Sequence, residues 1–198
     1  MARIADPVLK QELLDQVVRY LADHGIGMLS LNPMAVALGM SRHRLNHHFG
    51  QRHELIDAAL CRATEIQEEV QAKWFVTEPD MGQPEVFRRW WQWLVADPAN
   101  LALVRLGLEA ATLDATATGV SIAIRADQIG VWRTKIERRL IAAGVPQKAA
   151  ALEATNAKAT FTGLVVDLMA SGETLRLTKA LDDYLEQFEA RILLLSSR

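Results

Sequence analysis

Hydrophobic residues recur along this chain with the period of an α-helix, and the strict alternation typical of half-buried strands is hard to find. Leu14, Val17, Val18 and Leu21 fall at i, i+3, i+4 and i+7, which places them on one face of a helix. The same spacing recurs in three later segments, at 87–94, 161–168 and 181–195. The pattern predicts an all-α protein.

Glycine and proline divide this pattern into about nine helices. We expect them at about 8–24, 31–38, 42–48, 52–75, 85–96, 98–113, 118–143, 147–170 and 175–195. The short helices lie before residue 50 and the long ones follow. We therefore predict a small three-helix unit over residues 1–50 and a larger helical bundle over 51–198, connected by the helix at 52–75.

Composition and charge describe an ordinary soluble chain. Apolar residues make up 50% and charged residues 23% of the 198 residues, and the net charge is −2. No apolar run approaches the length that a membrane span needs, and the first residues lack the apolar core of a secretory signal. The one cysteine, Cys61, fits a reducing compartment and is expected to pack within its helix. We expect a cytoplasmic protein with no membrane partner.

The segment 30–49, SLNPMAVALGMSRHRLNHHF, has the pattern of two short helices joined by a tight turn. Ser30 and Ser41 are suited to cap the two helices, and Gly39 suits the left-handed position of the turn between them. Leu45 and Phe49, four residues apart, point inward from the second helix. This arrangement predicts a helix-turn-helix.

The second of these helices and the residues around it are rich in positively charged and protonatable side chains. Residues 41–53 hold four of the five histidines and three arginines, but no acid, although the chain as a whole is slightly acidic. Such donors reach DNA phosphates and base edges, so the predicted partner is double-stranded DNA. The predicted contacts are Ser30, Ser41, Arg42, His43, Arg44, Asn46, His47 and Arg52. If His43 and His47 face the duplex, affinity for DNA should rise as the pH falls from about 8 to about 6.

From residue 13 to residue 60 the chain resembles the DNA-binding domain of the tetracycline repressor (TetR) family. The residues in register with the family pattern are Gly25, Ser30, Leu31, Met34, Ala35, Gly39, Met40, Ser41, Leu45, His48, Phe49, Arg52 and Leu55. Asn46 stands where the family has a tyrosine, and Arg52 where it has a lysine. The resemblance implies a C-terminal ligand-binding and dimerisation bundle, and with it a repressor that a small molecule releases from DNA.

The C-terminal part supplies candidates for these roles. The tryptophans of FRRWWQWL, 87–94, serve either as core or as the wall of a pocket for an apolar or aromatic effector. The predicted pocket residues are Trp90, Trp93, Arg105, Glu109, Trp132, Phe161 and Met169. The last two helices carry long apolar stripes and small residues, so we expect a homodimer through them, two recognition helices one DNA turn apart, and a near-palindromic operator.

Two other classes of function remain open. The first is a metal-dependent enzyme that uses His43, His47 and His53, since two of these lie four residues apart on one helix face. The second is a DNA-binding protein with no effector. The helix-turn-helix register already accounts for the histidine positions, so we expect neither a catalytic metal nor another cofactor, and no enzyme activity.

Overall fold

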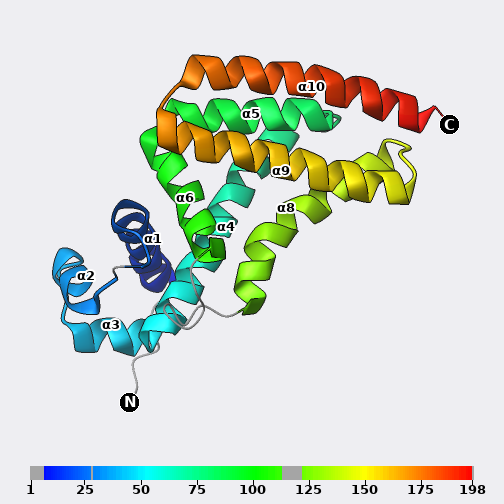
Figure 1. Ribbon diagram of the computed structural model, residues 1–198. Helices are drawn as coiled ribbons and strands as arrows, with labels where there is room; N and C mark the ends of the chain where they lie inside the picture. Colours follow the sequence, from blue (N-terminus) through cyan, green and yellow to red (C-terminus); the bar gives the residue numbers. More distant parts are fainter. Residues whose placement is uncertain (1–6, 28, 113–121, 198) are drawn as a thin grey trace. The chain divides into compact units, whose positions relative to one another are not determined.

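The computed structural model describes residues 7–27, 29–112 and 122–197, and over these residues it is built from helices alone (Figure 1). The helices are α1 (Pro7–His24), α2 (Leu31–Ala37), α3 (Arg42–Phe49), α4 (Arg52–Thr77), α5 (Gln83–Ala96), α6 (Pro98–Thr112), α8 (Ile122–Ala142), α9 (Gln147–Ser171) and α10 (Thr174–Ser196). The all-α prediction is confirmed, and the helix ends lie close to the expected ones. The predicted start of a helix at 118 falls outside the described residues.

The chain forms two compact units. Of the described residues, the first unit comprises 7–27, 29–74, 102–112 and 122–128, and the second comprises 75–101 and 129–197. We call them the head unit and the bundle unit. The helices α4, α6 and α8 each contribute residues to both. This division follows packing, so the division at residue 50 into DNA-binding and ligand-binding domains stays a prediction about function.

The core of the head unit is formed by the inward faces of α1, α2, α3, α4 and α6. On α1, Val17, Val18 and Leu21 of the predicted stripe are buried, while Leu14 is only half-buried. On α3, Leu45 is 1% exposed and meets a core to which α4 contributes leucines, isoleucine and alanines. Burial of such side chains contributes about 1.5–3 kcal/mol each, so packing rather than local helix propensity holds these short helices in place.

In the bundle unit, α10 packs against both α5 and α9 (Figure 1). Phe188 of α10 is 2% exposed, and its ring lies 6.2 Å from that of Phe87 in an edge-on contact. Trp91 of α5 donates its indole N–H to the Thr178 hydroxyl at 2.8 Å, which satisfies the one polar group of an otherwise buried ring. Among the described helices, none is both long and apolar enough to cross a lipid bilayer.

Candidate nucleic-acid interface

The helix α3 is fixed on the head unit by its cap, its turn and two buried side chains. The Ser41 hydroxyl accepts a hydrogen bond from the Arg44 amide at 3.2 Å, as expected of an N-cap residue. In the turn before it, Gly39 has a φ of +66°, a conformation that favours glycine. Leu45 and Phe49 are both buried. The helix-turn-helix geometry predicted for residues 30–49 is therefore present.

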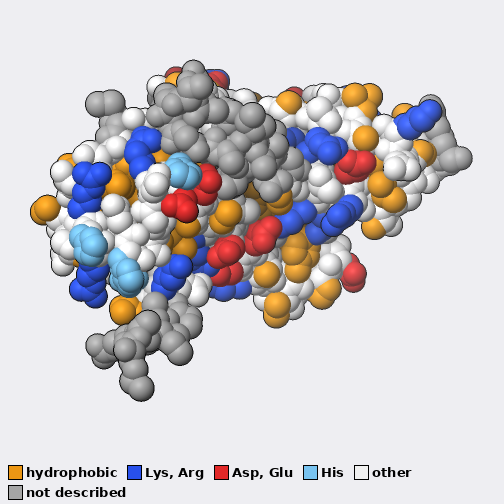
Figure 2. Space-filling view, turned by 90° about the horizontal axis from the view of Figure 1, so that it is seen from below, with side chains coloured by type: hydrophobic (Ala, Val, Ile, Leu, Met, Phe, Trp, Pro, Cys, Tyr) orange, Lys and Arg blue, Asp and Glu red, His pale blue; other side chains and the backbone are white. Residues whose placement is uncertain are grey.

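The outward side of α3 carries hydrogen-bond donors and no acid. Arg42, His43, Arg44, Asn46 and His47 are all exposed. Figure 2 shows blue and pale blue side chains, which are basic residues and histidines, gathered at the left of the view. Ser30 is also exposed, and it stands at the N-cap of α2 without a capping hydrogen bond from its side chain. The structure thus brings most of the predicted DNA contacts together on one exposed face.

His48 differs from the other histidines of this helix. Its side chain is half-buried, and its ring lies 6.2 Å from that of Phe49. Burial lowers the pKa of His48, and the neighbouring charges of Arg44, His47 and Lys10 lower it further. His48 is therefore a neutral packing residue at neutral pH rather than a cation that faces the partner.

Arg52 is engaged inside the head unit, contrary to its predicted role as a phosphate contact. Its guanidinium donates to the Leu29 carbonyl at 3.3 Å and to the Ile26 carbonyl at 3.0 Å. Both carbonyls belong to the connection between α1 and α2. A fork of planar N–H donors suits this double contact better than a lysine would, which gives a physical reason for arginine at this position.

Arg105 and Glu109 of α6 are likewise engaged inside the head unit, at the end of α1 and in the connection that follows it. Arg105 donates to the Ala22 carbonyl near the end of α1. One Glu109 carboxylate oxygen accepts the backbone N–H groups of Ile26 and Gly27, each at 3.0 Å. The prediction that these two side chains orient a bound effector is therefore replaced by a role in fixing α1.

Three of the predicted effector residues do meet in the bundle unit. The ring centroid of Trp90 lies 5.1 Å from that of Trp93 and 4.9 Å from that of Trp132, and both contacts are edge-on. The Lys135 ammonium lies 4.9 Å from the Trp132 ring, at cation–π distance. We call Trp90, Trp93, Trp132 and Lys135 the tryptophan cluster. Sequence reasoning missed Lys135, although its place three residues after Trp132 on a helix could have indicated it.

Phe161 belongs to a different aromatic group from the tryptophan cluster. Its ring lies 5.2 Å from Phe87 and 6.2 Å from Trp91, so it extends the core between α5 and α9. Met169 is half-buried on α9. α5 presents Trp90 and Trp91 to different neighbours, as successive residues on a helix must. Phe161 therefore lies beside Trp91, and its place in an effector pocket stays a prediction.

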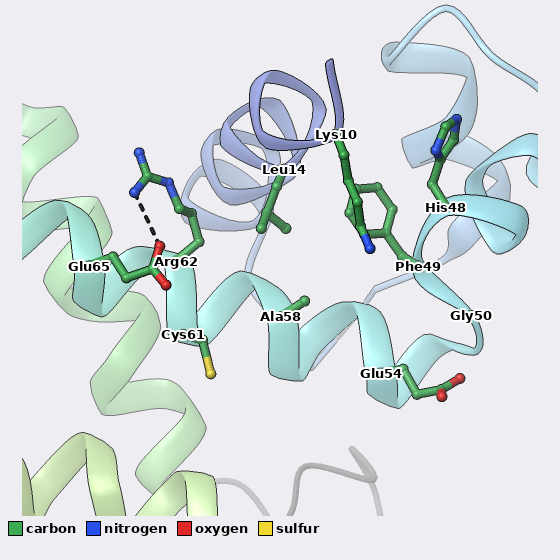
Figure 3. Close-up of a pocket in the computed structure, with 10 residues that line it drawn as sticks. All are labelled: Lys10, Leu14, His48, Phe49, Gly50, Glu54, Ala58, Cys61, Arg62 and Glu65. Carbon is green, nitrogen blue, oxygen red and sulfur yellow. Dashed lines mark hydrogen bonds and ion pairs between the residues drawn. The ribbon is translucent and has the colours of Figure 1, made fainter. Parts of the chain in front are cut away.

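A groove on the head unit runs between α1, the end of α3 and α4 (Figure 3). Lys10 and Leu14 come from α1, His48 and Phe49 from α3, and Cys61 from α4. Cys61 is exposed, so the prediction that it packs within its helix is wrong. Cys61 directly follows the buried Leu60, and successive residues on a helix point in different directions, so its side chain faces solvent.

At one end of the groove, Arg62 joins α4 to α1. Its Nε lies 2.7 Å from the Asp15 carboxylate, and its Nη1 lies 2.7 Å from Glu69 and 3.2 Å from Glu65. The hydrogen bonds from Asp15 and Glu69 raise the pKa of Arg62 above its usual range. The arginine side chain is 9% exposed, so these bonds fix the crossing of the two helices.

The outward sides of α9 and α10 leave large apolar side chains uncovered. On α9, Leu152 is 60% and Val166 51% exposed; on α10, Leu193 is 63% and Leu194 59% exposed. Between the two α9 residues lies Gly163, where a Cβ would meet nothing within 4 Å. Several exposed apolar residues next to small ones form the kind of surface that a helical interface uses.

The metal-dependent alternative finds no support. Over the described residues, no three histidine, cysteine or carboxylate side chains come close enough together to share a metal ion. In particular, His43, His47 and His53 do not form such a group.

Comparison with known proteins rests on structure. No protein-family profile matches the sequence, and no curated protein matches it significantly. A crystal structure described as a TetR-family transcriptional regulator, from Rhodococcus sp., is 18% identical over 94% of this chain and 98% of its own, with a TM-score of 0.66. A transcriptional regulator from Rhodococcus sp. Rha1 is 23% identical over 90% of this chain and 95% of its own, with a TM-score of 0.69. A multidrug binding protein, EbrR, crystallised with imidazole, is 20% identical over the same shares, with a TM-score of 0.61.

These structures show that the chain has the fold of TetR-family transcriptional regulators along nearly its whole length. The resemblance expected from residues 13–60 is thereby confirmed at the level of the fold, and it extends to the C-terminal helices, where the sequence pattern alone was general.

Proposed function

We propose that this protein is a DNA-binding transcriptional regulator, acting as a repressor that a small molecule releases from its operator. The observation that supports it best is α3: an exposed, acid-free row of donors on a helix anchored by Leu45 and Phe49. A recognition helix faces the negatively charged phosphates of DNA. Acidic side chains on that face would be repelled by the phosphates, whereas hydrogen-bond donors can bind them. The fold shared with transcriptional regulators is consistent with this reading.

The DNA-contacting residues that we propose are Ser30, Arg42, His43, Arg44, Asn46 and His47. His43 and His47 lie opposite the buried Leu45 on the helix, so they face the partner most directly. Ser41 serves mainly as the cap of α3. Arginine recognises guanine through two acceptors in the major groove, which makes Arg44 a candidate for base recognition.

The active species that we propose is a homodimer through α9 and α10. The exposed apolar residues on their outer sides, Leu152, Val166, Leu193 and Leu194, would be covered by the same surface of a second subunit. A two-fold dimer presents two α3 helices, and major grooves on one side of a duplex recur about every 34–36 Å. The operator is therefore expected to be a near-palindrome.

The effector site that we propose is the tryptophan cluster of the bundle unit. Trp93 and Trp132 are half-buried, so part of each ring is available to an apolar or aromatic ligand. The effector needs only to bind the DNA-incompetent arrangement of the helices more tightly. A tenfold higher affinity for that arrangement than for the DNA-binding one corresponds to about 1.4 kcal/mol. A useful switch needs about two such tenfold factors.

Selection of bound duplexes from a random pool tests the DNA-binding function. We expect one enriched near-palindrome, and a loss of about 1–3 kcal/mol of its binding free energy in Arg44→Ala. Arg138→Ala, which removes the same charge from an exposed position of α8, is the matched control and should bind as the wild type does. A wild-type selection that enriches no sequence would refute the proposal.

Tryptophan fluorescence against a panel of aromatic and apolar compounds tests the effector function. A compound that quenches the wild-type signal should also release the selected duplex, and Trp93→Ala should weaken both effects together. Compounds that bind at the tryptophans without releasing DNA would leave a DNA-binding protein with no effector response.

A further inference from the structure

The end of α1 and the connection that follows it, described at residues 25–27 and 29–30, are held by side chains from two other helices of the head unit. Arg52 comes from α4, and Arg105 and Glu109 come from α6. Together they engage backbone groups from Ala22 to Leu29. The Ile26 carbonyl also accepts the Leu29 N–H at 3.1 Å, whereas the N–H groups of Ile26 and Gly27 find their acceptor in Glu109.

Glu109 makes two of these contacts. A single carboxylate oxygen accepts two successive N–H groups, those of Ile26 and Gly27, each at 3.0 Å. Gly25 has a φ of +79°, and a Cβ added there would lie 3.1 Å from the same oxygen. The backbone therefore approaches the carboxylate so closely that only glycine fits without displacement. Hydrogen bonds to an ionised carboxylate are stronger than bonds between neutral groups.

The arginines bind the same stretch through its carbonyl groups. Arg105 donates to Ala22, at the end of α1, and Arg52 donates to Ile26 and Leu29. The N–H groups of Ile26 and Gly27 are thus bound by α6, and the carbonyl of Ile26 is bound by α4. Ser30, the N-cap of α2, follows directly, so the clamp fixes where the helix-turn-helix begins.

We propose that Glu109 and Arg105 are positioning residues for DNA recognition. By holding the end of α1 and the connection that follows it, these two side chains set the placement of α2 and α3. The inference rests on the proposed function and adds two residues outside the helix-turn-helix on which DNA recognition depends. It also explains why two charged side chains, an arginine and a glutamate four residues apart, do not simply pair with each other.

The test compares Glu109→Ala and Glu109→Gln with Asp23→Ala, which removes an exposed acid from the end of α1. Glutamine keeps an acceptor oxygen and loses the charge, so it should rescue part of the effect. Two properties are measured for folded protein: amide hydrogen exchange without DNA, and affinity for the selected operator relative to an unrelated duplex of equal length.

In Glu109→Ala we expect exchange at Ile26 and Gly27 to accelerate by about tenfold, and exchange in α2 and α3 to accelerate with it. Operator affinity should fall about tenfold, while affinity for the unrelated duplex changes less than about twofold, because misplacement harms base contacts more than phosphate attraction. The exchange rates and operator affinity of Glu109→Gln should lie between those of Glu109→Ala and the wild type. Asp23→Ala should match the wild type in both properties.

Faster exchange that stays confined to Ile26 and Gly27, or an equal loss of affinity for both duplexes, would overturn the inference, since either result describes a merely structural contact. If the wild type prefers no duplex, the proposed function fails, and the exchange measurement still decides whether α6 controls the placement of α3. If Glu109→Ala does not fold, Glu109→Gln carries the same test.

Discussion

The head unit and the bundle unit place their functional candidates in opposite ways. In the head, five exposed donor residues lie within six consecutive positions of one short helix, α3. In the bundle, the tryptophan cluster is assembled from α5 and α8, whose contributing residues are about 40 positions apart in the chain. A surface that one helix presents by itself can be recognised from its own sequence, whereas a surface built from two helices depends on how they cross.

The same contrast separates the two kinds of buried contact. On α3, the spacing of Leu45 and Phe49 determines which side faces inward, and the structure follows it. Phe161 has an equally regular spacing on α9, yet its neighbours are Phe87 and Trp91 rather than Trp90. Helical period identifies the buried side of a helix but not the side chain that it will meet.

The largest expected effect concerns the anchor of α3. Leu45→Ala should lower the free energy of unfolding by about 3 kcal/mol, because the side chain is 1% exposed and its removal leaves a cavity. Urea unfolding monitored by circular dichroism measures it. Val36→Ala, at a position on α2 that is 78% exposed, should change stability by less than about 0.5 kcal/mol. Similar losses at both positions would contradict the burial assigned to α3.

The junction of α1 and α4 should give the next largest effect. Arg62→Ala removes the shared cation from Asp15, Glu65 and Glu69 and leaves three carboxylates close together. We expect a loss of about 2 kcal/mol, less than for a fully buried pair because the carboxylates retain water. Urea unfolding with Arg138→Ala, an exposed arginine of α8, as the control checks it. Stability equal to that of the control would show that the arginine does not join the helices.

Glycines in the two units offer a sharper comparison. Gly25→Ala should destabilise the protein by about 1–2 kcal/mol, because alanine is strained at a φ of +79° and its Cβ would lie 3.1 Å from the Glu109 carboxylate. Gly163→Ala, in open space within α9, should be neutral or stabilise by about 0.5–1 kcal/mol. Thermal unfolding distinguishes the two, and a stable Gly25→Ala would argue against the close approach of Glu109.

The sequence predicts some of these features and not others. The fold, the helix bounds and the exposed donor face of α3 could be predicted, because each depends on local period, caps and turn residues. The partners of Arg52, Arg105 and Glu109 could not, because all three bind backbone groups, at the end of α1 or in the connection that follows it. Nearly every residue type has a backbone carbonyl and N–H group, so the sequence does not indicate which of these groups a side chain will bind.

The smallest expected effect is on the dependence of stability on pH. Burial lowers the pKa of His48 in the folded state, so the unfolded chain takes up a proton more readily. Stability should therefore fall as the pH drops below about 6.5, the ordinary histidine value. Urea unfolding at several pH values should show a weaker dependence in His48→Gln. An unchanged dependence in that variant would assign the effect to other groups.

The central claim is that the exposed face of α3 lies against DNA. Nuclear magnetic resonance of the isotope-labelled protein, titrated with the selected operator and with an unrelated duplex, tests it most directly. We expect the largest operator-specific chemical-shift changes at residues 42–47, with smaller changes along the α1–α2 connection. Shifts that are the same for both duplexes, or that concentrate on α9 and α10, would contradict it.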